Sequence, residues 1–430
     1  MSAGIIVMNK NAIAMAADSA VTVGDHAAIH NSANKLFALS MFEPIGVIIY
    51  ANAQFMQIPM EIIIKQYKTE LGRKSFPTLR QYVADFVNFL ESHADLFHYK
   101  ANEEAYVMSI CSDILQGLAN GYTNRIRQLV EKADRPPTND ENKQIQEDAF
   151  NETITFIDAQ KKSFAGFADY VRNSYSVQIK NYIGKSFPWV LNPEMLFDKI
   201  CYLFDTDFMR HGYMGAAVAG YGTSEIFPHM LHLKISGVLN GKLRYITVEE
   251  TVITENNQAT ITPLAQTDVM YTFILGYNDV FLRGLAERVP ASISAKLASI
   301  DENTFGKERK ELVQNLFCGF SNEVIQSAQD FSRKVYAQPL IFSIATLPIE
   351  ELALFAESMI NITSVRRRVT IDGNIGTVGG PIDVAIVTRG DGLIWLKRKH
   401  YFEAKKNPQY IYSRYGQAGV LQELNEDDEG

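Results

Sequence analysis

Three polar residues near the start of the chain have types and spacing that suit hydrolytic chemistry. Ser2 directly follows Met1, Asp18 follows a run of small apolar residues, and Lys35 begins the run "KLFAL". Removal of Met1, which a small second residue permits, would give Ser2 a free α-amine beside its hydroxyl. Such an amine has an ordinary pKa of about 7.7–8.0 and accepts a proton near neutral pH. The pattern therefore predicts a nucleophile that carries its own base.

Neighbouring groups would tune this nucleophile. A lysine ammonium beside the amine favours the neutral amine and lowers the pKa of the hydroxyl, and a carboxylate would hold that lysine in place. A backbone N–H near Ala51, at the end of the apolar run "GVIIYA", would bind the oxyanion of a tetrahedral intermediate. Ser19 has two open interpretations: it helps to hold the terminal amine, or it only ends the strand.

Short strands would have to position these residues. The apolar runs at residues 3–8 and 12–17 are separated by "NKN", which predicts a hairpin. If the hairpin closes around Lys10, residues whose numbers sum to 20 face each other, and Ser2 lies opposite Asp18. Directly opposed Cβ atoms are about 5 Å apart, so the two polar groups would meet. A slip of one residue would separate them.

The remaining apolar patterns predict two sheets with helices outside them. Further strands are expected at residues 33–39, 45–51 and 215–222. Two more hairpins should turn at Asn240-Gly241 and Asp391-Gly392. The expected helical regions are at about 75–210, 309–333 and 348–363. We expect an α+β protein in which residues 1–70 and 215–402 form the sheet domain, interrupted by an all-helical insertion at 71–214. Residues 403–430 would be an acidic, disordered tail.

The composition excludes some classes of protein. Of the 430 residues, 47% are hydrophobic and 21% are charged, with a net charge of −8, which is typical of a soluble globular protein and argues against nucleic-acid binding. The triplet Arg366-Arg367-Arg368 is too isolated to change this, and we expect it to be solvated. The chain contains no run of about 18 uninterrupted apolar residues, so the sequence predicts no membrane span. "GIIVM" lacks the basic region of a signal peptide.

The cysteines and histidines do not predict a metal site. Cys111, Cys201 and Cys318 lie far apart in apolar patterns, which indicates packing roles and a reducing compartment. His229 and His232 should face opposite sides of one strand, and we expect no carboxylate close enough to complete a site. The sequence predicts a cytoplasmic protein without a metal or organic cofactor.

Several short segments of the sequence, taken in order, resemble a known family. "SAGIIV", "AIAMAADSA", "ANKL" and "GVIIYANA", in this order, are similar to the start of proteasome β-type subunits and of the bacterial proteasome-like peptidase that works with an unfoldase ring. "AAVAGYG", "LHLKISGVLNGK" and "TVGGPIDVAIVTRGDGLIW" are similar to later family segments. The resemblance covers about 1–70 and 215–400. It implies the αββα sandwich, four layers thick, of an N-terminal nucleophile (Ntn) hydrolase.

The resemblance also implies roles for single residues. The family's processed Thr or Ser is followed sixteen residues later by Asp, as Ser2 is by Asp18, and the family lysine corresponds to Lys35, one residue later than usual. The family's oxyanion Gly corresponds best to Ala51. The chain departs from the family at two positions. Ala20 stands where the family usually has Arg, and Val378 stands where the family has a Ser before its Gly-Gly pair, here Gly379-Gly380. Asp372 and Thr377 are the candidate substitutes for the groups that support the amine.

We therefore expect a proteasome β-like hydrolase that cleaves peptide bonds through an acyl-enzyme and forms a homo-oligomer, with an unfoldase or another partner bound through the insertion. Two alternatives stay open. One is a small-molecule amidase on the same fold, with the insertion as a lid over the cleft. The other is an inactive assembly module, in which Asp18 and Lys35 are a structural ion pair.

Overall fold

The computed structural model describes residues 2–23, 28–30, 32–97, 99–209, 212–299, 306, 312–313, 323–369, 378–400, 402 and 406–407. Asp372, Thr377 and Cys318 lie outside the described residues, as does most of the predicted tail. No helix in these ranges combines the length and apolar character that crossing a bilayer requires.

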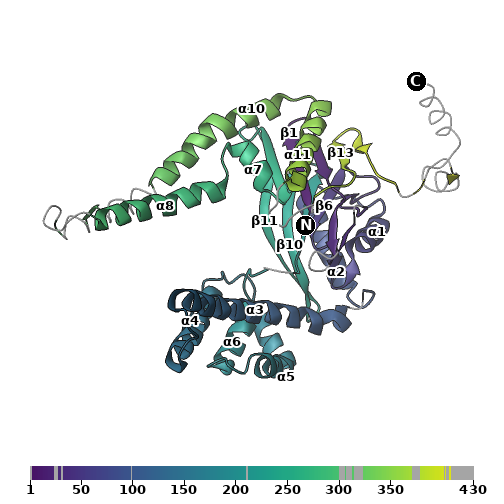
Figure 1. The fold of residues 1–430 in the computed structure, drawn as a ribbon. Coiled ribbons are helices and arrows are strands. Elements are labelled where there is room, and N and C mark those ends of the chain that lie inside the picture. Colours follow the sequence, from purple (N-terminus) through teal and green to yellow (C-terminus); the bar gives the residue numbers. More distant parts are fainter. Residues whose placement is uncertain are drawn as a thin grey trace.

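Two five-stranded antiparallel sheets form the centre of the protein (Figure 1). The first has the order β12-β1-β2-β13-β14 and the second β11-β10-β9-β6-β5. Their strands are β1 Ala3–Asn9, β2 Ile13–Ala17, β12 Ala259–Ala265, β13 Asp383–Thr388 and β14 Gly392–Lys397 in the first sheet, and β5 Leu36–Ala38, β6 Ile45–Ala51, β9 Met214–Gly220, β10 His229–Leu239 and β11 Lys242–Val252 in the second. Short pairs β3 Val21–Val23 with β4 Ala28–His30, and β7 Gln54–Phe55 with β8 Ile58–Pro59, lie outside both sheets.

The inner faces of the two sheets share one hydrophobic core. Ile6 and Met15 of the first sheet belong to the same buried cluster as Ile48 and Ala217 of the second. The sheets approach closely, because a Cβ on Gly46 would lie only 2.5 Å from the Met15 sulfur. Every residue of β1, β2 and β9 is buried, since both faces of these strands are covered.

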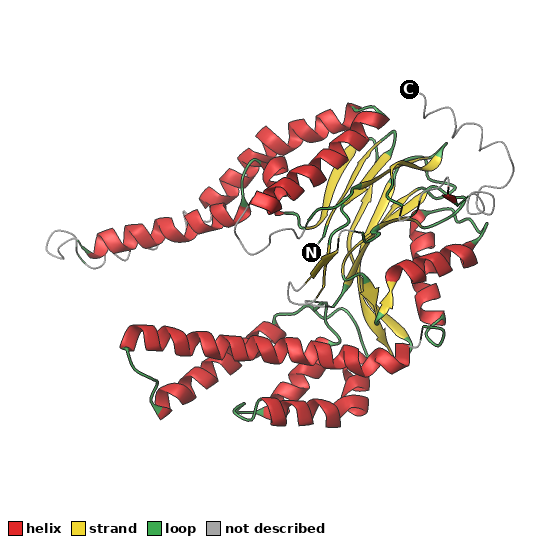
Figure 2. Ribbon diagram, turned by 45° about the vertical axis from the view of Figure 1, so that its right-hand side comes forward, coloured by secondary structure: helices red, strands yellow, loops and turns green. Residues whose placement is uncertain are grey.

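Helices cover the outer faces (Figure 2). Side chains of α1 and α2 pack in a common core with the second sheet, and those of α7, α10 and α11 pack with the first sheet. These helices are α1 Met60–Leu71, α2 Leu79–Ser92, α7 Asp268–Leu275, α10 Gln338–Thr346 and α11 Ile349–Val369. The prediction of a helix at 348–363 is confirmed. Although α2 lies in the predicted helical region, its apolar face completes a sheet core.

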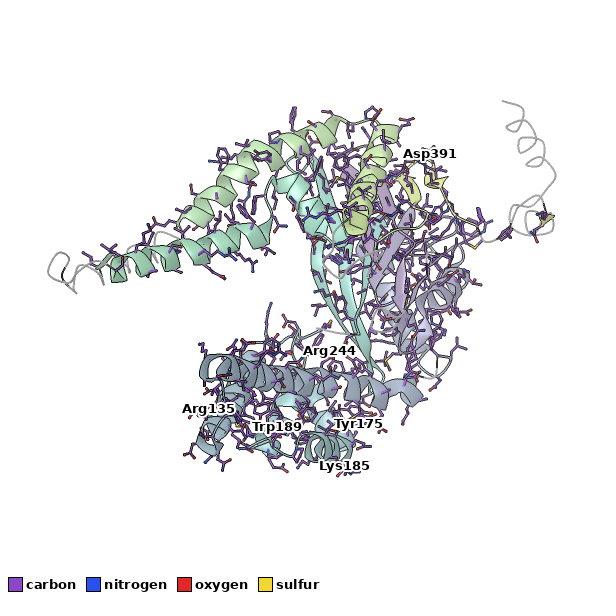
Figure 3. All side chains as sticks on the ribbon, viewed as in Figure 1. Arg135, Tyr175, Lys185, Trp189, Arg244 and Asp391 are labelled. Atoms are coloured by element: carbon purple, nitrogen blue, oxygen red, sulfur yellow. The ribbon has the colours of Figure 1, made fainter. Side chains whose placement is uncertain are left out.

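Four further helices have a hydrophobic core of their own, to which Leu239 of β10 also contributes. They are α3 Tyr99–Ala133, α4 Asn139–Asp158, α5 Phe167–Ser186 and α6 Pro193–Leu203. Arg244 of β11, fully buried, joins them to the second sheet by donating to the carbonyls of Leu203, Phe204 and Phe208 at 2.8–3.1 Å. Figure 3 shows Arg244 at this junction.

Another helical segment extends away from the sheets (Figure 1). It consists of α8 Asp279–Ala298, the helical residues 323–332 and the π-helical turn η1 Arg333–Ala337, which continues into α10. Of the helix predicted at 309–333, the described residues contain the helical positions 312–313 and 323–333.

The predicted hairpins form, with one error of register. The turn at Asn240-Gly241 is confirmed, and β13 and β14 also form a hairpin, in which Gly392 is already the first residue of β14. In the first hairpin Gly4 faces Ala17, so paired numbers sum to 21 and the predicted sum of 20 is wrong.

The side chain of Asn9 explains the register of the first hairpin. Asn9 Oδ1 accepts hydrogen bonds from the N–H groups of Asn11 and Ala12, and the Asn9 N–H donates to the carbonyl of Ala12. These bonds close a two-residue turn at Lys10-Asn11 instead of a three-residue turn centred on Lys10. Ala3, not Ser2, therefore lies beside Asp18.

Candidate active site

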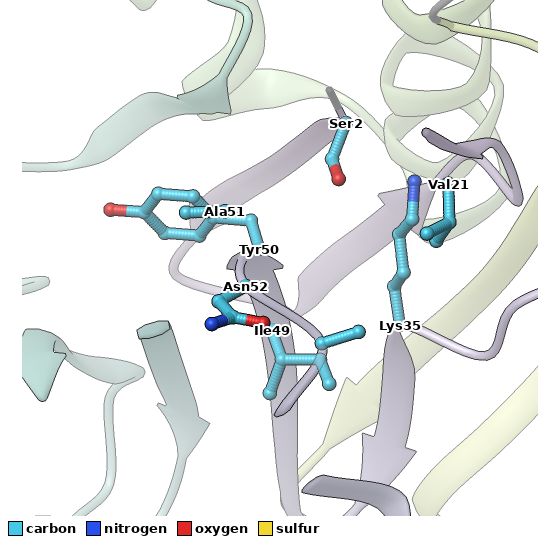
Figure 4. Close-up of a pocket in the computed structure, with 8 residues that line it drawn as sticks. Ser2, Val21, Lys35, Ile49, Tyr50, Ala51 and Asn52 are labelled. Carbon is cyan, nitrogen blue, oxygen red and sulfur yellow. The ribbon is translucent and has the colours of Figure 1, made fainter. Parts of the chain in front are cut away.

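Ser2 lies just before β1 at the edge of a pocket (Figure 4). The residue is 7% exposed, and its carbonyl accepts a hydrogen bond from the Gln266 N–H at 3.0 Å. Figure 4 shows its hydroxyl and the Lys35 side chain directed into the same space. The pocket is lined by Ser2, Val21, Lys35, Ile49, Tyr50, Ala51, Asn52 and Ala53.

Asp18 is a buried carboxylate that four donors surround. Its Oδ1 accepts from the Ala3 N–H at 2.9 Å and from Lys35 Nζ at 2.5 Å. Its Oδ2 accepts from the N–H groups of Ala20 at 3.2 Å and Gly379 at 3.1 Å. The N–H of Ala3 at the start of β1 thus holds Oδ1, the oxygen that also binds the lysine, and the backbone after β2 and before β13 holds Oδ2.

Lys35 is 4% exposed and directly precedes β5. Its Nζ donates to the carbonyl of Ala20 as well as to Asp18, both at 2.5 Å, and its own carbonyl accepts from the Ile49 N–H. Burial lowers the pKa of the Lys35 ammonium, and the attraction of Asp18 opposes this without cancelling it. Lys35 therefore loses a proton more easily than a surface lysine does.

Ser19 is fully buried next to these groups. Its hydroxyl donates to the Pro381 carbonyl at 2.5 Å, and its N–H donates to the carbonyl of Gly379. These bonds tie the end of β2 to the chain before β13. The arrangement fits the interpretation in which Ser19 holds the strand end, and the same loop delivers the Gly379 N–H to Asp18.

Ala51, the last residue of β6, has an unusual backbone conformation. Its φ is +65°, in the left-handed region, which costs an L-residue about 1–2 kcal/mol. Strain of this kind persists where the surroundings fix it, and it is concentrated at functional sites. The strained residue lines the same pocket as Ser2 and Lys35.

The two histidines have separate surroundings. His232 accepts or donates a 2.5 Å hydrogen bond with the Tyr50 hydroxyl, and burial lowers the pKa of His232 to about 4, so its ring is neutral at pH 7. His229 lies between Glu225 and Glu250, at 2.7 and 2.9 Å. The expectation that no carboxylate lies close was wrong, because Glu225 precedes His229 by only four residues and the β10–β11 ladder brings Glu250 to it. Among the described residues, no three metal-ligating side chains form a cluster that could hold a metal ion.

Sequence reasoning missed the partners that come from distant segments. Gln266 contacts Ser2 only because β12 pairs with β1, which aligns Ala265 with Ala3. Tyr50 reaches His232 across the intervening strand β9 because its ring lies over Gly215, where a Cβ would be only 2.1 Å from the ring. No local pattern encodes either pairing. The contact of Lys35 with the Ala20 carbonyl could have been predicted from the sequence. Ala20 is only two positions after Asp18, so it cannot be far from a lysine that binds Asp18.

No family model matches the chain, and no curated protein matches it either. Solved structures that are similar to it include an Anbu Gly-1 mutant from Hyphomicrobium sp. strain MC1, with 9% identity, a TM-score of 0.26 and coverage of 99% of this chain and 97% of that chain. They also include Anbu, described as an ancestral beta-subunit, from Yersinia bercovieri, with 10% identity, a TM-score of 0.28 and coverage of 97% of each chain.

A third similar structure is the helical assembly of the Anbu complex from Pseudomonas aeruginosa, with 11% identity and a TM-score of 0.28, over 99% of this chain and 96% of that chain. At these identities and TM-scores, no property of those proteins is transferred to this chain. The functional assignment therefore depends on the residues of the site.

Proposed function

We propose that the protein is an Ntn hydrolase that cleaves amide bonds with Ser2 after Met1 is removed, and that its two sheets and outer helices form the αββα sandwich of that class. Peptides are the proposed substrates. The observation that carries the proposal is the buried ammonium of Lys35, held by Asp18 and the Ala20 carbonyl at the pocket that Ser2 borders. A purely structural ion pair has no need of a neighbouring hydroxyl in a pocket.

In the proposed reaction, Ser2 Oγ attacks the substrate carbonyl carbon while its proton passes to the α-amine of the same residue. Lys35 keeps that amine neutral beforehand, since a nearby ammonium disfavours a second positive charge. The N–H of Ala51 stabilises the oxyanion. The α-amine then gives its proton to the leaving nitrogen as the C–N bond breaks, and water hydrolyses the resulting ester.

The support of the α-amine is also part of the proposal. Asp372 and Thr377 stay predicted supports, and they lie outside the described residues. Homo-oligomer formation and the binding of an unfoldase through the helices α3–α6 are proposed on the family resemblance alone.

Intact-mass analysis combined with covalent labelling tests the proposal. The mature protein should lack Met1, and a β-lactone probe should add one acyl group, which peptide mapping assigns to Ser2. Ser2→Ala should abolish labelling while the thermal midpoint stays within about 2 °C of the wild type, because deletion of one hydroxyl from a small side chain changes little packing.

Ser92→Ala, which removes a hydroxyl from the surface of α2, is the matched control and should be labelled normally. Retained Met1, or equal labelling of Ser2→Ala and the wild type, would refute the mechanism. Either result would favour the inactive assembly module instead.

A further inference from the structure

Arg367 is buried, although the sequence predicted that its arginine triplet would be solvated. It is 8% exposed, whereas Arg366 and Arg368 are exposed. Successive residues of a helix point about 100° apart, so only one of the three can face the sheet. Arg367 Nε donates to Gln266 Oε1 at 2.6 Å, and its Nη2 forms an ion pair with Asp268 at 2.5 Å.

Gln266 connects this arginine to the start of the chain. Its backbone N–H donates to the Ser2 carbonyl at 3.0 Å, and the residue is 9% exposed. The preceding residue, Ala265, lies opposite Ala3 and has a φ of +65°. The chain therefore turns out of β12 at the point where it reaches Ser2, and Arg367 holds the side chain of the first residue after that turn.

We propose that Arg367 is a positioning residue for Ser2 and acts through Gln266. This inference rests on the proposed function of Ser2. Chain ends are usually loose, and a nucleophile at a chain end has covalent support on one side only. Because a misplacement of about 1 Å can cost about 10²-fold in rate, a hydrolase of this kind needs contacts that fix its first residue.

The planar guanidinium of arginine suits this role. Its fork binds the side chain of Gln266 and the carboxylate of Asp268 at the same time, which fixes the end of β12 relative to the start of α7. A lysine offers a point charge without the planar fork. It can keep the ion pair with Asp268 but not the same geometry at Gln266.

The rate of β-lactone acylation tests the inference. Arg367→Met should lower the maximal first-order rate of acylation at Ser2 at least 10-fold, and the probe concentration for half-maximal rate should change less than 3-fold. Arg366→Met, a change at the exposed neighbour, should leave both values unchanged. Arg367→Lys should recover only part of the rate.

A double-mutant cycle separates positioning from general loosening of the fold. If Arg367 acts through Gln266, then Gln266→Ala should slow acylation as well, and the combined variant should be no slower than the slower single variant. Additive losses would overturn the inference. Should Arg367→Met fail to fold, Gln266→Ala carries the test, because it removes the acceptor and keeps the backbone N–H.

Hydrogen exchange distinguishes failure of this inference from failure of the proposed function. In Arg367→Met, the amides of peptides covering residues 2–8 and 259–267 should exchange at least 10-fold faster, while those of β9 stay protected. If the wild type is not acylated but exchange rises in this way, the proposed function fails and the structural link stands. Unchanged exchange in both peptides, or an unchanged acylation rate in Arg367→Met when the wild type is acylated, would overturn the role of Arg367.

Discussion

The contacts around Asp18 predict that its removal destabilises the protein more than removal of Lys35. Asp18→Asn takes away the only carboxylate bonded to Lys35 among the described residues and turns an amide N–H₂ toward backbone donors that previously met an oxygen. Breaking a buried ion pair by removing one partner costs about 3–5 kcal/mol. We expect the free energy of unfolding to fall by that amount.

In Lys35→Met, the buried carboxylate of Asp18 is the partner that remains. The carboxylate of Asp18 keeps three backbone donors, those of Ala3, Ala20 and Gly379, and methionine replaces most of the apolar stem of the lysine. Two charge-assisted hydrogen bonds are lost, to Asp18 and to the Ala20 carbonyl, each worth about 1.5–3 kcal/mol, but the cost of burying the ammonium, which is several kcal/mol, disappears as well. We expect a loss of about 2 kcal/mol or less.

Urea unfolding followed by circular dichroism measures both losses, provided that the variants share one denaturant dependence. Asp391→Asn, a change to an exposed carboxylate of the β13–β14 hairpin, is the control and should cost less than about 1 kcal/mol. A Lys35→Met variant at least as unstable as Asp18→Asn would refute this reasoning. It would show that the lysine, and not the ring of backbone donors, holds the carboxylate in place.

Two further predictions concern Lys35. Lys35→Arg should lower the rate of Ser2 acylation at least about 10²-fold, in the range for losing a positioned proton-transfer group, because a planar guanidinium cannot replace a compact ammonium in contact with both Asp18 and Ala20; a near-normal rate would make the lysine purely structural. Burial lowers the pKa of Lys35 in the folded protein. Between that lowered pKa and the ordinary value of 10.5, the unfolded chain therefore binds more protons than the folded protein does. The stability of the wild type should thus rise with pH in that window, relative to the stability of Lys35→Met. Urea titrations of both proteins at increasing pH measure the difference, and a pH-independent difference would contradict the expected shift.

The sequence alone determined the parts of this protein that depend on local signals. The apolar runs and the turn residues at Asn240-Gly241 specified strands and a hairpin, since a two-residue turn and the strands beside it are neighbours in the chain. Ser2, Asp18 and Lys35 were chosen as candidates from their types and spacing, and the structure brings them to one pocket or its immediate surroundings.

Tertiary structure alone decided how these parts meet. The register of the first hairpin depended on whether the Asn9 side chain closes the turn, a choice that strand patterns do not contain. Arg367 is buried because α11 packs on the first sheet, whereas its neighbours in the same triplet stay exposed. The left-handed conformation of Ala51 and the contact of Gln266 with Ser2 depend on strands paired across long separations. Such contacts follow from packing and hydrogen bonding of the whole chain, so no local pattern of residues could have determined them.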